Sequence, residues 1–154
     1  MLTMAGDGNC QFRTISFELF ATQDMHLHVR RVVMEHIKSH HAEYECFLGE
    51  DMDAYITCMS RGGTWGDELT LRAACDAFGV LTHVVTSDAQ NWYLKYQPAN
   101  LKSDKEMFLT YIAPIHYNAI RRKSSLQLLT HSLGTSFKRL NRAASKRADA
   151  SDIC

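Results

Sequence analysis

Cys10 and His116 are the two residues whose types and surroundings point to nucleophilic chemistry. Cys10 follows a loop that contains Gly6 and Gly8, and it opens a run of apolar residues at helical spacing. The N-terminus of a helix carries partial positive charge and free backbone N–H groups, which favour a thiolate over a thiol. The same N–H groups can stabilise the oxyanion that forms when a thiolate attacks a carbonyl. A small buried cysteine without chemistry also fits this position, so the position alone leaves both interpretations open.

A cysteine nucleophile needs a base, and His116 has the most suitable surroundings of the eight histidines. It follows Pro114 at the start of a strand-like run, and Asn118 lies two residues further on. Alternate residues of a strand share a face, so Asn118 can hold one imidazole nitrogen while the other faces the thiolate. This pattern indicates a Cys-His-Asn site. Asp7 is a second candidate for orienting the imidazole, or alternatively for holding the amides of the loop before Cys10.

The other histidines predict neither a metal site nor a second base. Five of them lie on or beside one predicted helix and are interpreted as exposed side chains: His26, His28, His36, His40 and His41. His36 and His40 are four residues apart, a spacing that can hold a metal, but no third ligand follows at metal-site spacing. We therefore expect no metal and no cofactor.

The elements that must position these residues follow from hydrophobic periodicity and from the residues that begin and end helices. Helices are predicted over 10–21, from a cap at Asp24 to about 40, over 52–59, and over 69–78 between Asp67 and Gly79. Strands are predicted over 81–86, 91–97 and 107–113, with a fourth beginning at His116. Helices come first and strands later, which predicts the α+β class, with helices packed on a largely antiparallel sheet.

Composition limits the class of protein. The chain has 154 residues, of which 45% are hydrophobic and 22% charged, as expected for one globular domain. No apolar run approaches the roughly 18 residues of a membrane helix, and the N-terminus lacks a signal-peptide pattern. The five cysteines are odd in number and include no CxxC, which favours a reducing intracellular location in the cytoplasm, the nucleus or both.

Charge is distributed unevenly along the chain. Residues 1–120 hold nine basic and fifteen acidic residues, a formal charge of −6, whereas residues 121–154 hold eight and two, a charge of +6. We place the domain edge near residue 121 and expect a basic tail with one short helix over 126–133 and disorder from 135. Such a tail can make weak, nonspecific, salt-dependent contacts with anions.

Three separated segments resemble the motifs of the ovarian tumour (OTU) domain cysteine proteases, which are deubiquitinases. Residues 7–13 read DGNCQFR, residues 63–71 read GTWGDELTL, and residues 115–120 read IHYNAI. The resemblance covers residues 6–120 and implies a papain-like OTU fold. It also implies hydrolysis of the isopeptide or peptide bond after the C-terminal glycine of ubiquitin, through an acyl-enzyme. Residues 1–120 would then be the protease domain, and ubiquitin or its conjugates the partner.

The resemblance also implies roles for single residues. Cys10 would be the nucleophile and His116 the general base; Asn118 would orient the imidazole, and Asp7 occupies a motif position that the family often treats as catalytic. The oxyanion hole would be formed by the backbone of the loop before the nucleophile, namely Asp7, Gly8, Asn9 and Cys10. Acidic side chains near the cleft would attract the arginines of the ubiquitin tail. Arg13 is expected in a salt bridge rather than against the substrate.

Three alternatives to a deubiquitinase stay open. One is a non-catalytic ubiquitin-binding module, and another is a binder of nucleic acid or membrane surfaces that uses the basic tail. The third keeps the thiol protease but changes its substrate to another ubiquitin-like modifier or a polyprotein. The intact set of Cys10, His116 and Asn118 argues against the first alternative, and the absence of a groove-reading motif argues against the second.

Overall fold

The computed structural model describes residues 1–49 and 51–120. The predictions for the tail lie outside the described residues, and the domain edge near 121 stays a prediction. The elements are α1 (Cys10–Phe20), α2 (His26–Ser39), α3 (His41–Glu45), α4 (Met52–Met59), α5 (Glu68–Phe78), β1 (Leu81–Thr86), β2 (Tyr93–Tyr96), β3 (Glu106–Ile112) and β4 (His116–Ala119).

The ends of the helices follow local chemistry. Asp67 accepts a hydrogen bond from the Thr70 backbone N–H and so caps α5, which ends at Gly79 in the left-handed conformation, as the sequence predicted. The predicted cap at Asp24 is wrong. The helix α2 begins two residues later without a side-chain cap, because the Asp24 carboxylate accepts instead from the Thr22 hydroxyl at 3.1 Å.

The four strands form one mixed sheet in the order β2-β1-β3-β4. The pairs β1–β2 and β3–β4 are antiparallel, and the central pair β1–β3 is parallel. The α+β class is confirmed, and the sheet is antiparallel except at its centre. At the far edge, Leu2 exchanges two backbone hydrogen bonds with Ala119, so the N-terminal segment extends the sheet beyond β4.

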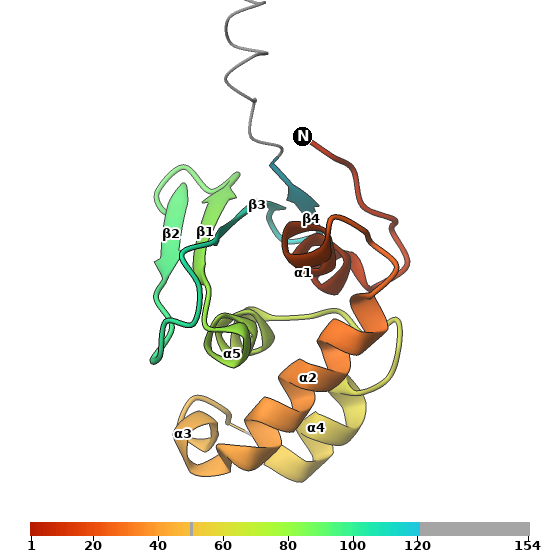
Figure 1. Cartoon of the computed structure of the whole chain (residues 1–154). Coiled ribbons are helices and arrows are strands. Elements are labelled where there is room, and N and C mark those ends of the chain that lie inside the picture. Colours follow the sequence, from red (N-terminus) through yellow and green to blue (C-terminus); the bar gives the residue numbers. More distant parts are fainter. Residues whose placement is uncertain (50, 121–154) are drawn as a thin grey trace, which may run out of the picture. The chain divides into compact units, whose positions relative to one another are not determined.

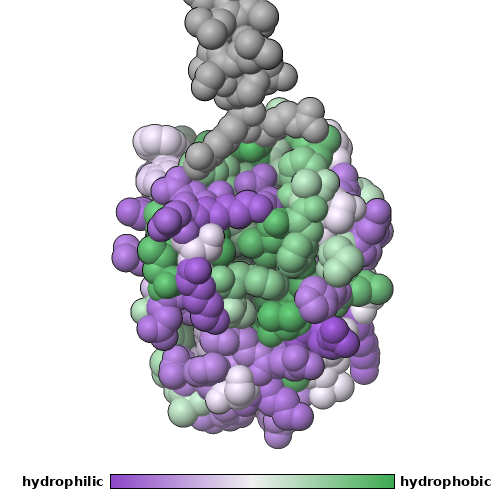
Figure 2. Space-filling model, viewed as in Figure 1, coloured by the Kyte–Doolittle hydropathy of each residue, from purple (hydrophilic) through white to green (hydrophobic). Residues whose placement is uncertain are grey.

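In Figure 1, α1 lies beside β3 and β4, α5 lies below the sheet, and α2 runs from α1 down to α3 and α4. α1 packs against β3 and β4, while α5 packs against α2, which also contacts α1, α3 and α4. The core between them is formed by fully buried apolar side chains such as Phe12, Ile15, Leu71, Met107 and Leu109. Figure 2 shows apolar residues gathered around α1 on the viewed face, and hydrophilic residues over the lower helices. Burial of the core brings the first residue of α1 to the edge of the sheet formed by β4.

None of the helices within residues 1–49 and 51–120 has the length and apolar character needed to cross a membrane.

Candidate active site

Cys10 is the first residue of α1, and the loop before it is held against a second loop. Cys10 is nearly buried, with 9% of its surface exposed. Gly8 has a φ of +79°, in the region that favours glycine. A Cβ at position 8 would also overlap the backbone carbonyl of Gly63. Both the conformation and the close approach therefore require glycine immediately before Asn9 and Cys10.

Asp7 fixes the start of this loop. Its carboxylate accepts hydrogen bonds from Arg13, at 2.6 Å from Nη2 and 3.2 Å from Nε, and from the Asn9 backbone N–H at 3.1 Å. The Arg13 guanidinium and the Asn9 amide hold the pKa of the Asp7 carboxyl well below its ordinary value. The predicted salt bridge of Arg13 is confirmed. These contacts support the loop-holding role of Asp7, and no hydrogen bond joins Asp7 to His116 among the described residues.

Gln11 ties α5 to the helix that carries Cys10. The Gln11 side chain is 1% exposed; its Nε2 donates to the Asp67 carbonyl at 2.8 Å, and its Oε1 accepts from the Thr70 hydroxyl at 2.7 Å. A Cβ on Gly66 would overlap the Gln11 amide, so a larger residue there would displace the Gln11 side chain from these hydrogen bonds. The start of α5 is therefore fixed relative to the nucleophile.

Arg30 belongs to the site but was missed in the sequence. It is 2% exposed and donates to the Asn9 side-chain oxygen at 2.8 Å. The same Asn9 oxygen accepts from the Gly63 backbone N–H at 2.9 Å. A signal for its burial was present, because Arg30 lies three and seven residues before Val33 and Ile37, which places it on the apolar face of α2.

His116 begins β4, which packs against α1. It pairs with Ile112 and is half-buried, while Asn118 pairs with Thr110 and is 2% exposed. The register places His116 and Asn118 on the same face of the strand, as their spacing predicted. The Asn118 Oδ1 accepts from the Met4 backbone N–H at 3.0 Å, so it also anchors the segment that leads into the nucleophile loop.

Cys10, His116 and Asn118 thus lie on two elements in contact. Within residues 1–49 and 51–120 no hydrogen bond joins these three side chains to one another. Catalytic hydrogen bonds often form only when substrate is bound. Tyr117, between the two β4 residues, is buried, and burial raises the pKa of its phenol above the ordinary value; Cys10 adds to this effect because it lies nearby.

The remaining cysteines and histidines have other surroundings. Cys75 is buried, and burial raises the pKa of its thiol to about 11; Cys46 and Cys58 are exposed. His36 stacks on His40 at 4.2 Å between ring centres, and in the part of the chain that the structure describes no group of three potential ligands could hold a metal ion.

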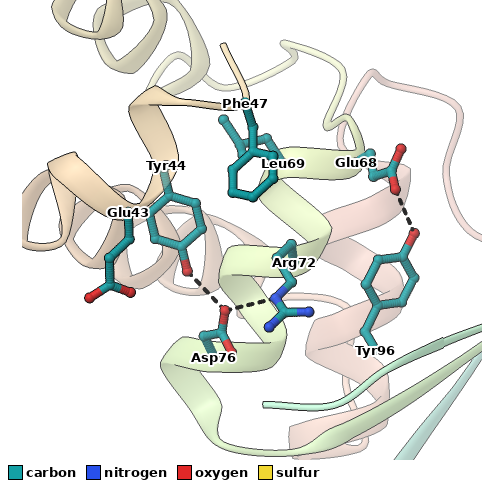
Figure 3. Close-up of a pocket in the computed structure, with 8 residues that line it drawn as sticks. All are labelled: Glu43, Tyr44, Phe47, Glu68, Leu69, Arg72, Asp76 and Tyr96. Atoms are coloured by element: carbon teal, nitrogen blue, oxygen red, sulfur yellow. Dashed lines mark hydrogen bonds and ion pairs between the residues drawn. The ribbon is translucent and has the colours of Figure 1, made fainter. Parts of the chain in front are cut away.

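A separate pocket of about 540 Å³ lies between α3, α5 and β2 (Figure 3). Its lining combines apolar rings with carboxylates: Glu43, Tyr44, Phe47, Glu68, Leu69, Arg72, Asp76 and Tyr96. The Asp76 carboxylate accepts from the Tyr44 hydroxyl and from Arg72 Nε, both at 3.0 Å. Two of the lining residues, Glu43 and Phe47, are exposed, Phe47 over 77% of its surface.

Cys10 begins a helix, and that helix packs against a strand that begins with histidine. This is the arrangement of a cysteine hydrolase. The family model described as OTU-like cysteine protease matches residues 5–119. The chain is 43% identical over 115 residues to the OVARIAN TUMOR DOMAIN-containing deubiquitinating enzyme 10 of Arabidopsis thaliana. The matched segment covers 75% of this chain and 32% of that protein.

Two solved structures share the fold. The structure of the OTUD1 OTU domain has a TM-score of 0.67 at 19% identity and covers 77% of this chain and 83% of that one. The Hazara virus OTU bound to ubiquitin has a TM-score of 0.65 at 16% identity, over 80% of this chain and 81% of that one. The chain belongs to the OTU-like cysteine protease family. It spans about a third to a half of the length of the first curated relatives that it matches.

Proposed function

We propose that this chain is a thiol-dependent deubiquitinase, which hydrolyses the isopeptide or peptide bond after the C-terminal glycine of ubiquitin. The observation that carries the proposal is the position of Cys10 at the start of α1, packed against the strand that His116 begins, in a chain of the OTU family. The named activity of the curated relatives and the ubiquitin complex of a protein with the same fold support the substrate.

The chemistry follows from the roles of these residues. His116 accepts the Cys10 proton, and the thiolate attacks the carbonyl carbon of the ubiquitin C-terminal glycine. Backbone N–H groups of the loop formed by Asp7, Gly8, Asn9 and Cys10 stabilise the oxyanion. The amine leaves with the proton from His116, and water then hydrolyses the thioester with His116 again acting as base. Asn118 orients the imidazole.

The test is covalent capture by ubiquitin with a thiol-reactive C-terminal electrophile. We expect one adduct with the natural chain, none with Cys10→Ala, and an unchanged adduct with Cys58→Ser, which removes an exposed thiol elsewhere. A chain that binds ubiquitin without forming an adduct would be a binding module. Adducts with another ubiquitin-like modifier alone would assign a different substrate.

We place this activity inside the cell, in the cytoplasm, the nucleus or both. Four described cysteines are free thiols, including the exposed Cys46 and Cys58, which fits a reducing compartment. Microscopy of the tagged full-length protein tests the location.

A further inference from the structure

Asn9 holds the N-cap position of α1 but does not cap the helix. Its side chain makes no hydrogen bond to the first turn, and its backbone has a ψ of 8°. Asp51 and Asp67, the N-cap residues of α4 and α5, have extended backbones, and their side chains accept first-turn N–H groups. Asparagine is among the best capping residues, so something must divert Asn9.

Two donors hold the Asn9 oxygen away from α1. Gly63 donates its backbone N–H at 2.9 Å, and Arg30 donates from Nη2 at 2.8 Å. The remaining contacts of Arg30 are also neutral: the Thr64 carbonyl at 2.6 Å, the Met59 carbonyl at 2.7 Å, and the Phe12 ring, whose centre lies 3.9 Å from the guanidinium carbon. Arg30 therefore joins Asn9 to the segment 59–64.

Arg30 is costly to bury. Its Nε has no hydrogen-bond partner, and across residues 1–49 and 51–120 no carboxylate forms an ion pair with it. Burial lowers the pKa of the guanidinium to about 10, and the charge of the Asp7 carboxylate opposes this shift only in part. An arginine that serves only packing gains nothing from a buried charge, since an apolar side chain of the same size commonly stabilises a protein as well or better.

The value of ψ at Asn9 also sets the direction of the next peptide N–H, that of Cys10. If Asn9 turned to the extended backbone of Asp67, its oxygen would occupy first-turn N–H groups and the Cys10 N–H would rotate. The Cys10 N–H is one of the groups that the proposed hydrolysis needs for the oxyanion, so its rotation would misdirect an oxyanion donor.

We infer that Arg30 is a positioning residue: together with the Gly63 N–H it holds the Asn9 side-chain oxygen, prevents Asn9 from capping α1 and keeps the Cys10 backbone N–H directed at the oxyanion. The inference rests on the proposed function. Arg30 touches neither the thiol nor the substrate and acts through Asn9.

The test is a double-mutant cycle on hydrolysis of a ubiquitin C-terminal substrate. Arg30→Met keeps the bulk over Phe12 but loses the donors; we expect kcat to fall roughly 10- to 100-fold, a fraction of the loss of an oxyanion donor, while KM stays within about threefold. Binding of ubiquitin aldehyde, whose adduct places an oxygen at the same amides, should weaken by a similar factor. The matched control is Arg31→Met, the exposed neighbour, which should keep the natural kcat.

The cycle separates positioning from packing. In an Asn9→Ala background no side chain can cap, so Arg30→Met should cost less than about threefold further. Equal losses in both backgrounds would overturn the inference, as would a folded Arg30→Met variant with the natural kcat. Arg30→Lys is the second variant if Arg30→Met does not fold. Failure of both to fold would assign Arg30 to the core alone. A natural chain that neither hydrolyses nor captures ubiquitin would refute the proposed function instead.

Discussion

At the residue scale, Asp7 and Arg13 form an ion pair, and Arg13 lies about one helical turn after the nucleophile. Because the carboxylate bonds both Arg13 and the Asn9 N–H, Asp7 acts on the loop that carries the proposed oxyanion donors. We expect Asp7→Asn to lower kcat roughly 10- to 100-fold through misplacement of that loop. Arg13→Gln should cause a similar loss, and the double variant should be little worse than either, as measured by kcat. The control is Asp53→Asn, an exposed carboxylate on α4. Fully additive losses would show that Asp7 acts on another group.

Asn118 has two tasks that different measurements separate. Its oxygen accepts the buried Met4 N–H, and its side chain shares a strand face with His116. We expect Asn118→Ala to lower the free energy of unfolding by about 1–3 kcal/mol, because the Met4 N–H loses its acceptor. It should also lower kcat by roughly 10- to 100-fold, measured well below the melting temperature. Asn118→Asp keeps an acceptor and should restore most of both. Loss of stability with an unchanged kcat would remove Asn118 from the catalytic mechanism.

At the scale of elements, α2, α3 and α5 meet at His36. Its Nε2 lies 3.1 Å from the Tyr44 hydroxyl oxygen. Burial, with the adjacent His40, lowers the pKa of His36 below its ordinary value of 6.5. The unfolded chain therefore binds this proton more readily than the folded one, and stability is lost as pH falls below about 6.5.

The pH dependence of unfolding tests this packing. We expect the free energy of unfolding in urea to decline between pH 8 and pH 5, and His36→Gln to flatten that decline. Comparison of the two chains at pH 8, where histidine is neutral in both states, measures any packing lost by the substitution itself. Parallel pH curves for the two proteins would contradict the assignment to His36.

Elements with local signals were predictable, and those fixed by distant contacts were not. Adjacent residues predict the helix cap at Asp67, the helix end at Gly79 and the strand over 81–86. The structure has all three. The parallel pairing of β1 with β3 depends on which strands the helices cover, and no local pattern encodes it. The short α3 was missed because the apolar pattern of α2 stops at His40.

The candidate site divides in the same way. Cys10, His116 and Asn118 follow from local patterns and motif resemblance, and the structure places them on elements in contact. Arg30 and the Met4–Asn118 bond connect parts of the chain far apart in sequence, so spacing alone does not show which groups they meet.

At the scale of the whole molecule, charge should govern the encounter with ubiquitin. The pocket in Figure 3 has the exposed side chains of Glu43 and Phe47 in its lining, an acidic and apolar surface that suits a basic and apolar part of ubiquitin. We expect Glu43→Lys to raise KM roughly 10-fold at low salt with kcat unchanged, and the effect to shrink at high salt. Glu45→Lys, two residues away on α3 and outside the pocket lining, is the control. Equal effects of the two variants would indicate net charge rather than the pocket.

The basic tail should be dispensable for catalysis but should alter its dependence on salt. The three motifs end at residue 120 and the family match ends at 119, so a chain that stops at residue 120 keeps every proposed catalytic group. We expect its kcat for a ubiquitin C-terminal substrate to stay within about twofold of the natural value, since the proposed catalytic and positioning residues all lie before residue 120. Removing residues 121–154 also changes the formal charge from 0 to −6. A more acidic protein attracts the arginines of ubiquitin more strongly, so kcat/KM should rise at low salt and converge with that of the full chain as salt screens the charges.

Calorimetry of both chains is the control for folding. A shortened chain that melts at a lower temperature and loses kcat would show that the tail belongs to the folded domain.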